Sequence, residues 1–257
     1  KWKKIFLWFM SYINSLLLIV KNAKEIDFVL IYSADYKKYF FYYFVSRLCN
    51  IVLLLERSEF PIIFYQKDRY NQNILLKLKK KIIEKSYKLF DGWILETQNL
   101  VDYYKNYANK KSKFCIVPMT VEVERFADIE ISPNLYGDYI AYCGNLKDID
   151  GVSILIKAFA IIANKYSSLK LVLAGNSDEM CKHKTLVKKL DIESKVIFLG
   201  RIDRDMVPSF LANAKILALA SPTSERSCAT MPCKVGEYLC TGVPSVITGL
   251  DRKSTRL

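Results

Sequence analysis

Tyr139-Ile140-Ala141-Tyr142-Cys143-Gly144 is a short apolar run closed by a glycine, and the second half of the chain repeats this pattern. Such runs predict buried strands, because a parallel sheet is covered on both faces. The predicted strands are Tyr139–Cys143, Leu169–Ala174, Lys195–Leu199, Ile216–Ala220 and Ser245–Thr248. The predicted helices between them are Val152–Lys165, Asp178–Leu190, Arg204–Ala214 and Pro232–Cys240. This alternation predicts a parallel sheet joined by right-handed crossovers.

The first half shows the same alternation in a less regular form. Its predicted strands are Ile26–Tyr32, Ile51–Glu56, Gly92–Glu96 and Phe114–Val117, and its predicted helices are Tyr36–Leu48, Gln72–Phe90 and Leu100–Tyr107. Turn residues at Pro133-Asn134 and Gly137 are typical of a linker. We therefore expect two α/β domains, residues 1–130 and 139–250, joined by residues 131–138. In the second domain, Asn176 followed by Glu179 predicts a helix N-cap with a glutamate at the third helical position.

The composition is that of a folded globular protein. The chain has 257 residues, of which 51% are hydrophobic and 25% charged, and these fractions exclude a disordered or collagen-like chain. The net charge of +13 raises the question of nucleic acid. Lysines outnumber arginines 30 to 9, however, and no arginine-rich run is present, so we expect no nucleic-acid partner. Lysine clusters such as Lys79-Lys80-Lys81 keep an anionic membrane surface open as a partner.

Neither the cysteines nor the single histidine has the spacing of a metal site. The seven cysteines include no paired Cys-x-x-Cys motifs, so we expect them to be reduced. His183 shares a predicted helical face with Val187 and Leu190, which is typical of a packed structural histidine. Two Asp-x-Asp motifs, at residues 148–150 and 203–205, occur at about the frequency expected by chance. We therefore expect neither a metal nor a cofactor.

The ends of the chain are unusual. Residues 5–20 carry no charge but fall short of the roughly 20 apolar residues that a membrane-spanning helix needs. A buried or cleft-lining helix is the favoured interpretation, and an interfacial membrane helix and a span or signal peptide are the alternatives. Residues 251–257 resemble a translated sequencing adapter, so we expect an artefactual, loosely packed tail and a chain truncated at both ends.

The sharpest functional signal follows the strand that ends at Ala220. A polar loop leads to Pro232, which we expect at the first position (N1) of the next helix. The free N–H groups at a helix start bind anions, and Lys234 adds a cation beside them. Glu237, about one turn further on, would accept hydrogen bonds from a diol, so this arrangement suits a nucleotide sugar. The alternative is an ordinary helix with a Lys234–Glu237 surface pair.

Four motifs occur in order along the second half of the chain. They are Tyr142-Cys143-Gly144-Asn145-Leu146, Leu171-Val172-Leu173-Ala174-Gly175, Val196-Ile197-Phe198-Leu199-Gly200-Arg201 and Pro232-Cys233-Lys234-Val235-Gly236-Glu237-Tyr238-Leu239. Together they resemble the donor domain of a family 4 glycosyltransferase of GT-B fold, of the type that makes bacterial capsules and surface polysaccharides. The resemblance covers residues 139–250 strongly and 26–126 loosely. It implies two Rossmann-like domains that face a cleft, both incomplete in this chain.

The resemblance also implies a reaction and its site. A sugar would pass from a UDP- or GDP-sugar to a glycan or polyprenyl-linked acceptor, with retention of configuration and without metal, in the cytoplasm or peripherally on the inner membrane face. The implied donor-binding residues are Gly144, Asn145, Lys147, Arg201, Thr230, Met231, Lys234 and Glu237. In the first domain, Glu56 and Glu59 lie in the region where many members carry a histidine near the reacting sugar. We expect the 257-residue chain to be inactive by itself.

Three positions depart from the family pattern. Ala229 stands where many members have a first glutamate, although the branch with Pro-x-Lys-x-x-Glu commonly lacks it. Asn145 and Asp150 stand where members carry basic residues for the diphosphate, and Lys147 would take over that role. These departures favour one alternative, a non-catalytic nucleotide-sugar-binding homologue that acts as a partner subunit. Another GT-B enzyme, such as a nucleotide-sugar epimerase, is the second alternative.

Overall fold

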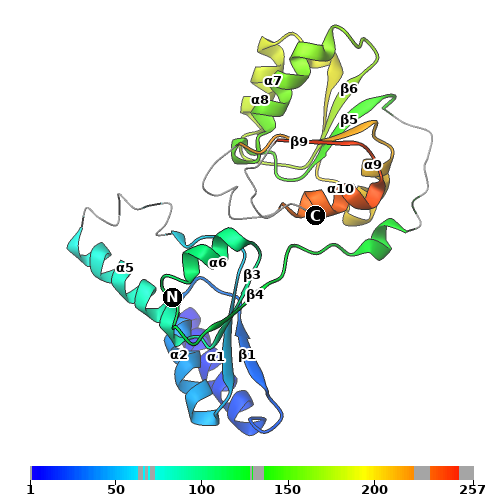
Figure 1. Ribbon diagram of the computed structural model, residues 1–257. Helices are drawn as coiled ribbons and strands as arrows, with labels where there is room; N and C mark the ends of the chain where they lie inside the picture. Colours follow the sequence, from blue (N-terminus) through cyan, green and yellow to red (C-terminus); the bar gives the residue numbers. More distant parts are fainter. Residues whose placement is uncertain are drawn as a thin grey trace. The chain divides into compact units, whose positions relative to one another are not determined.

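The computed structural model describes residues 2–62, 66, 69, 73–127, 129, 136–222 and 232–248, apart from the side chains of residues 2–5 and 8. The chain divides into two compact units, Lys1–Pro118 and Met119–Leu257 (Figure 1). Each unit is an α/β structure built on its own parallel sheet. The fold class predicted from the alternation of strands and helices is therefore confirmed.

The first unit contains a four-stranded parallel sheet in the order β1-β2-β3-β4. Its strands are β1 (Phe28–Ile31), β2 (Val52–Arg57), β3 (Gly92–Leu95) and β4 (Lys113–Ile116). The connecting helices are α2 (Tyr36–Cys49), α5 (Ile74–Ser86), which continues into the short helix η1 (Tyr87–Leu89), and α6 (Gln98–Tyr104). Each of these elements lies within a few residues of its predicted position. Because neighbouring strands follow one another in sequence, every crossover moves the chain one strand along the sheet.

Local signals set the ends of α2, and aromatic packing holds the first unit together. The side chain of Asp35 accepts a hydrogen bond from the Lys37 N–H at 3.0 Å and so caps the start of the helix. Asn50 ends the helix with a left-handed φ of 53°. In the core, Trp93 is 1% exposed and its ring lies 4.9 Å from the ring of Tyr104. Aromatic burial of this kind contributes strongly to stability.

The helix α1 (Trp2–Lys21) contacts α2 along one edge only. Ile19 is buried there in one cluster with Val45 and Ile51. Phe6 and Leu18, by contrast, are 62% and 64% exposed. The favoured prediction of a buried helix over residues 5–20 therefore holds only for this edge. In the part of the chain that the structure describes, no helix has the length and apolarity to cross a bilayer.

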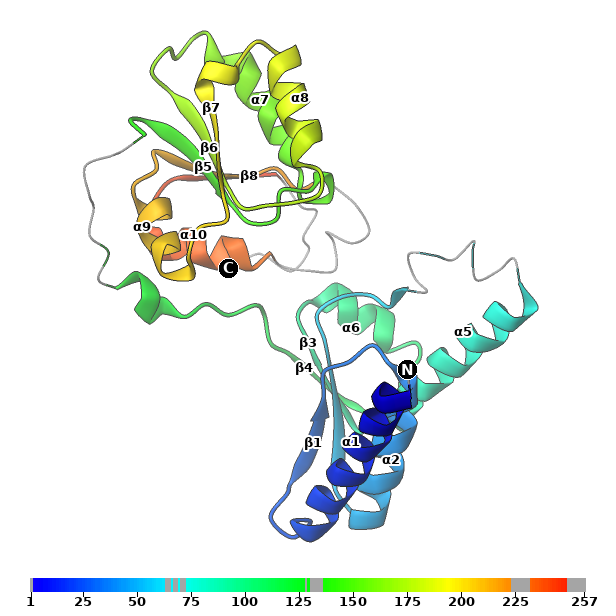
Figure 2. The same cartoon turned by 180° about the vertical axis from the view of Figure 1, so that it is seen from behind.

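The second unit contains a five-stranded parallel sheet in the order β7-β6-β5-β8-β9. Its strands are β5 (Tyr139–Cys143), β6 (Lys170–Ala174), β7 (Val196–Gly200), β8 (Ile216–Leu219) and β9 (Ser245–Ile247). Its α-helices are α7 (Val152–Ala163), α8 (Met180–Lys189), α9 (Val207–Ala212) and α10 (Cys233–Thr241). Short helices are η2 (Val123–Phe126), η3 (Asp148–Asp150), η4 (Glu193–Lys195) and η5 (Arg204–Met206). Helices α7 and α8 cover one face of the sheet, and α9 and α10 cover the other (Figures 1 and 2).

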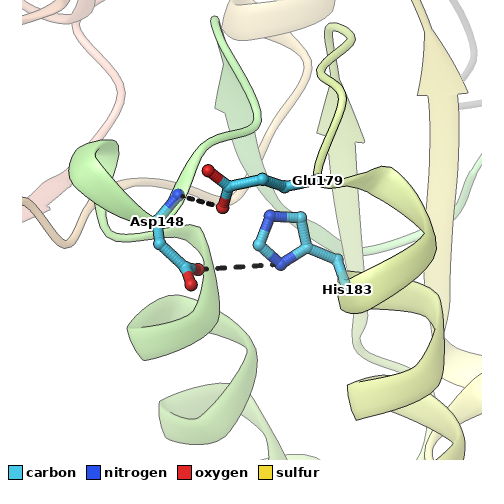
Figure 3. A group of neighbouring side chains, drawn as sticks. All are labelled: Asp148, Glu179 and His183. Atoms are coloured by element: carbon cyan, nitrogen blue, oxygen red, sulfur yellow. Dashed lines mark hydrogen bonds and ion pairs between the residues drawn. The ribbon is translucent and has the colours of Figure 1, made fainter.

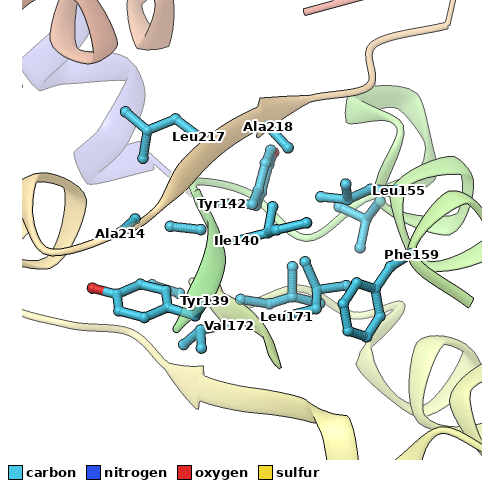
Figure 4. Close-up of a cluster of buried hydrophobic side chains, with 14 of the residues drawn as sticks. Tyr139, Ile140, Tyr142, Leu155, Phe159, Leu171, Val172, Ala214, Leu217 and Ala218 are labelled. Carbon is cyan, nitrogen blue, oxygen red and sulfur yellow. The ribbon is translucent and has the colours of Figure 1, made fainter. Parts of the chain in front are cut away.

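The core of the second unit surrounds β5, as Figure 4 shows. Leu171 and Val172 on β6 are fully buried beside it. Tyr139 places its ring in this core and donates its hydroxyl to the Phe210 carbonyl at 2.6 Å. Burial raises the pKa of the Tyr139 hydroxyl to about 12, so this donor keeps its proton at neutral pH. A chain that packs this densely fixes the strand ends on which the site depends.

Two predicted helix starts are wrong in detail. Glu179, and not Asn176, is the N-cap residue of α8. The Glu179 carboxylate accepts a hydrogen bond from the Asp148 N–H at 3.0 Å, so a contact distant in sequence takes the place of the expected local cap. Helix α10 begins at Cys233, which makes Pro232 its N-cap rather than its N1 residue.

The division between the units lies at Pro118, before the predicted domain end at residue 130. Phe126 gives the physical reason, because it is 7% exposed within the core of the second unit. Arg125 also donates a hydrogen bond to the Arg204 carbonyl at 2.8 Å. Residues 131–135 of the predicted linker lie outside the described residues.

Candidate functional site

The site lies where the winding of the second sheet changes direction. From β5 the chain moves to β6 and β7, and it then returns to β8 and β9 on the other side of β5. In open α/β sheets, ligands bind at the carboxyl ends of the strands at such a switch point. The turn after β5 and the end of β8 therefore meet at this switch point, where Gly151 lies against Ala220.

Two glycines in and after the turn that follows β5, Gly144 and Gly151, lie in close contact with residues that come later in the chain. Gly151 has a φ of 85° and lies against the Ala220 carbonyl, so a β-carbon at residue 151 would overlap that carbonyl. Gly144 directly follows β5 and lies against the side chain of Lys234, which a β-carbon would likewise displace. At residue 151 the obstacle is backbone that cannot move aside, whereas at residue 144 the lysine side chain could give way and the φ of 152° is what favours glycine.

Lys234 and Gly144 are two of the predicted donor-binding residues, and the structure brings them together. The ammonium of Lys234 lies 5.5 Å from the centre of the Tyr142 ring, a cation–π arrangement. The Tyr142 hydroxyl donates to the Asn145 carbonyl at 2.9 Å, which fixes the turn after β5. Asn145 itself is exposed beside them. The result is a cation held at the edge of an exposed glycine turn.

Helix α10 starts beside this turn. Pro232 has no N–H, and its carbonyl accepts the Val235 N–H at 2.9 Å. The first N–H groups of a helix have no acceptor within the helix, and they carry the positive end of its dipole. Cys233 and Lys234 supply these groups in α10. Thr230 and Met231, which were also predicted to bind the donor, lie outside the described residues.

Glu237 has a partner that the sequence did not indicate. Its Oε1 lies 3.9 Å from Nη1 of Arg125, and the two side chains are 26% and 17% exposed. Arg125 comes from η2, which reaches α10 because Gly236 leaves room for Val121: a β-carbon there would lie 3.3 Å from the Val121 β-carbon. The structure therefore shows an Arg125–Glu237 pair and not the Lys234–Glu237 surface pair of the alternative interpretation.

The remaining predicted residues lie in separate places. Lys147 forms an ion pair with Asp178 at 3.2 Å, which directs its ammonium toward the segment before α8. Arg201 is exposed just after β7, at the same carboxyl edge of the sheet but two strands from β5. Glu56 and Glu59 lie at and just after the carboxyl end of β2 in the first unit, where the Glu59 carbonyl accepts the Tyr104 hydroxyl at 3.1 Å.

A polar cluster supports the turn after β5 from below (Figure 3). The ligand-type atoms of Asp148, Glu179 and His183 all lie within 4.8 Å of one another, a set that could hold a metal ion. Protein groups already contact each of them. Lys182 and Ser153 donate to the Asp148 carboxylate, and these hydrogen bonds lower the pKa of Asp148. These hydrogen bonds anchor the turn.

His183 is the buried member of this cluster, as the sequence predicted. It is 0% exposed, and its Nε2 lies 2.9 Å from the Leu146 carbonyl. A carbonyl only accepts hydrogen bonds, so Nε2 is the donor in this contact, while Nδ1 lies 3.4 Å from the Ser153 hydroxyl and 3.9 Å from Oδ1 of Asp148. Ser177 also donates to the Leu146 carbonyl, so two side chains hold this turn from the β6–α8 side.

One thiol lies at the edge of the site. Burial is the main reason that the pKa of Cys143 is raised, to about 11, and nearby Glu237 adds to the shift. Cys143 is therefore neutral at physiological pH. Six cysteines of the described residues are free thiols, as predicted; Cys228 lies outside those residues.

Comparison with known proteins agrees with this geometry. Residues 137–255 match the family model for "Glycosyl transferases group 1". An uncharacterised glycosyltransferase of Methanocaldococcus jannaschii is 28% identical over 149 residues, which are 54% of this chain and 36% of that protein. N-acetyl-alpha-D-glucosaminyl L-malate synthase of Bacillus anthracis is 31% identical over 118 residues, 42% of this chain and 29% of that protein. The chain thus spans roughly a third of the length of these curated relatives.

Solved structures match both units. HepE of Anabaena in complex with UDP and glucose superposes with a TM-score of 0.63 at 16% identity, covering 90% of this chain and 62% of that one. Sucrose-phosphate synthase of Thermosynechococcus elongatus superposes with a TM-score of 0.62 at 15% identity, covering 86% and 56%. The two parallel-sheet units have the GT-B fold of these neighbours. The match of residues 137–255 to the family model and the GT-B neighbours together support a glycosyltransferase.

Proposed function

We propose that this chain belongs to an enzyme that transfers a sugar from a UDP- or GDP-sugar to a glycan or polyprenyl-linked acceptor in surface-polysaccharide synthesis. The family match and the HepE complex with UDP and glucose support this reaction class. The enzyme would act with retention of configuration. It would work in the cytoplasm or peripherally on the inner membrane face, where a polyprenyl-linked acceptor would present its head group.

The contact between Lys234 and Gly144 at the switch point is the observation that carries this proposal. A diphosphate placed over Gly144 would meet the Lys234 ammonium and the first N–H groups of α10 together. These fixed positive groups would stabilise the negative charge that grows on the leaving diphosphate. Because the charge is met by a lysine and by helix N–H groups, the proposed mechanism needs no metal.

Glu237 would bind the ribose in this arrangement. Its carboxylate lies one helical turn beyond Lys234 on α10, and Arg125 orients it from the other side. A carboxylate accepts hydrogen bonds from two vicinal hydroxyls, and Arg125 would help to hold it in position. Asn145 would contact the diphosphate from the turn after β5, and Arg201 would line the base pocket. Lys147 would need to leave Asp178 to reach the diphosphate, so we assign it a weaker contribution.

Titration calorimetry of the chain with UDP, GDP and ATP in excess EDTA tests the proposal. We expect UDP or GDP to bind more tightly than ATP, and we expect the affinity to survive EDTA. If neither UDP nor GDP binds, the site assignment is wrong. If binding appears only after Mg²⁺ or Mn²⁺ is restored, the metal-independent mechanism is wrong.

The two alternatives make different predictions for activity. A non-catalytic homologue, favoured by Asn145 and Asp150, would bind the nucleotide sugar and never turn it over, even with its acceptor and any partner subunit present. An epimerase would convert the donor alone, with no acceptor added. Product analysis by NMR separates both from a transferase, which releases nucleoside diphosphate only when an acceptor is present.

A further inference from the structure

Helix α5 has two apolar faces, and only one of them is covered. Its inner face includes Ile83, which is 8% exposed. Its outer face carries four exposed apolar side chains: Ile74 at 75%, Leu75 at 70%, Leu78 at 53% and Ile82 at 44%. At about 100° per residue these four positions form one stripe that spans roughly a quarter of the helix circumference. Figures 1 and 2 show the first half of α5 extending beyond the rest of the first unit.

Scattered exposed leucines are normal, but a continuous outer stripe on a helix that already has a core-facing side is not. A surface helix of a soluble protein is normally polar on the side away from its core. Here the outward side repeats apolar residues at helical spacing, so the helix is apolar on two sides. A partner surface that excludes water from this stripe would remove the free-energy cost of exposing its apolar side chains to solvent.

Charge identifies the kind of partner. The helix carries lysines at positions 77, 79, 80, 81 and 85 and one acidic residue, Glu84. By helical angle, Lys77 and Lys81 lie along one flank of the apolar stripe and Lys79 lies along the other, while Lys85 falls within the angular range of the stripe near the C-terminal end of the helix. These four side chains are exposed. Lysines have long apolar stems, so they can keep their ammonium groups at a polar boundary while the stripe beside them is buried.

We propose that the outer face of α5 is a binding surface for an anionic lipid membrane. The apolar stripe would enter the boundary between head groups and acyl chains, and the flanking lysines would contact lipid phosphates. A nucleic acid would meet the lysines but would give the stripe nothing to contact. A second copy of this helix would bring the lysine flanks against one another. An anionic lipid surface satisfies both features at once.

The exposed apolar surface of α1 lacks this second feature. Phe6, Leu7, Leu17 and Leu18 are more than half exposed, but the lysines of α1 (Lys3, Lys4 and Lys21) lie at its two ends and not along the flanks of the apolar stretch. The inference therefore rests on α5 alone. It is also independent of sugar transfer, because lipid binding can be measured without donor or acceptor.

Co-sedimentation of the chain with vesicles tests this surface. We expect binding to phosphatidylcholine vesicles that contain about 30% phosphatidylglycerol, weak binding to phosphatidylcholine alone, and a marked loss of binding in about 0.5 M NaCl. The double substitution Leu75→Gln and Leu78→Gln removes two of the four apolar side chains of the stripe, and we expect the affinity for anionic vesicles to fall at least about tenfold. The double substitution Lys81→Gln and Lys85→Gln should lower the affinity for anionic vesicles roughly 10- to 30-fold, at about fivefold per lysine.

Matched controls isolate the surface from general effects. Lys110→Gln with Lys111→Gln removes the same charge from an exposed turn, and Ile161→Gln removes an apolar side chain that is 83% exposed on α7. Both should bind vesicles within about twofold of the unchanged chain. All of these positions are exposed, so circular dichroism should show an intact fold in every variant.

Four outcomes would overturn the proposal. The first is no preference for anionic over neutral vesicles, and the second is an equal loss in the matched controls. The third is tighter binding of a single-stranded oligonucleotide through the lysines, with no effect of the leucine changes on it or on the vesicles. The fourth is a dimer in light scattering that the leucine changes dissociate, which would assign the stripe to a second copy of the chain.

Discussion

Arg125 Nη1 lies 3.9 Å from Glu237 Oε1, and this pair ties the segment before β5 to the helix that would bind the donor. Arg125 also donates to the Arg204 carbonyl at 2.8 Å, so its guanidinium is held from two directions. The position of Glu237 therefore depends on a residue in a different part of the chain. A carboxylate that is held in position in advance loses little conformational freedom when a ligand binds.

The Glu237 carboxylate should matter more for ligand binding than for stability. Glu237→Ala should lower the affinity for UDP or GDP roughly ten- to a hundredfold, because charge-assisted hydrogen bonds are worth about 1.5–3 kcal/mol. Glu237→Gln keeps the shape and should cause a smaller loss. Calorimetric titration measures both.

Arg125→Gln is the control for this pair. The pair is long and partly exposed, so a double-mutant cycle on the free energy of unfolding should give a coupling below about 1 kcal/mol. Nucleotide affinity should fall less in Arg125→Gln than in Glu237→Ala. Unchanged nucleotide affinity in Glu237→Ala, with the fold intact, would reduce Glu237 to a structural partner of Arg125.

Lys234 should recognise the phosphates and not the nucleoside. Lys234→Met keeps the apolar stem and removes the charge, so affinity for UDP or GDP should fall about tenfold or more, while affinity for the free nucleoside should not change. NMR titration with both ligands gives the comparison. Lys184→Met, at an exposed position on α8, serves as the matched control. Equal losses for nucleotide and nucleoside would point to damage to the turn after β5 rather than to a lost phosphate contact.

His183 should act on the site through the turn that it holds. His183→Leu removes the donor to the Leu146 carbonyl, so we expect a loss of about 1–3 kcal/mol in the free energy of unfolding and a lower nucleotide affinity. Val187→Ala, one turn further along α8, leaves a cavity at a residue that is 3% exposed and should destabilise the fold with little effect on affinity. Equal effects of the two changes on affinity would mean that His183 serves only the core.

Asp148 should contribute to stability only when it is ionised. Its hydrogen bonds from Lys182 and Ser153 lower its pKa below the usual value near 4. A carboxylate whose pKa is lowered in the folded state contributes its full stability above the unfolded-state pKa. That contribution is lost as the pH falls through the folded-state pKa. Asp148→Asn should therefore lower the urea midpoint at pH 7, and this difference should narrow toward pH 3. Asp205→Asn, at an exposed residue of η5, should show little difference at either pH.

Local pattern determined most of the secondary structure of this protein. The run Tyr139–Cys143 forms β5 with the predicted bounds, and α2 begins at Tyr36 where Asp35 caps it. Both features depend on residues that are neighbours in sequence, namely a continuous apolar run and a capping side chain. The order of strands and helices likewise predicted two parallel-sheet units, because the handedness of crossovers limits the ways in which such elements can be joined.

Tertiary structure alone decided which residues meet at the site. The sequence placed Lys234 and Gly144 in one hypothetical site, but their contact follows from the adjacency of β5 and β8, which the strand order sets. It gave no sign that Arg125 would reach Glu237, or that the Glu179 carboxylate would accept a hydrogen bond from the Asp148 N–H. Periodicity records which face of an element is buried, whereas the partner of a polar side chain depends on which distant element packs against that face.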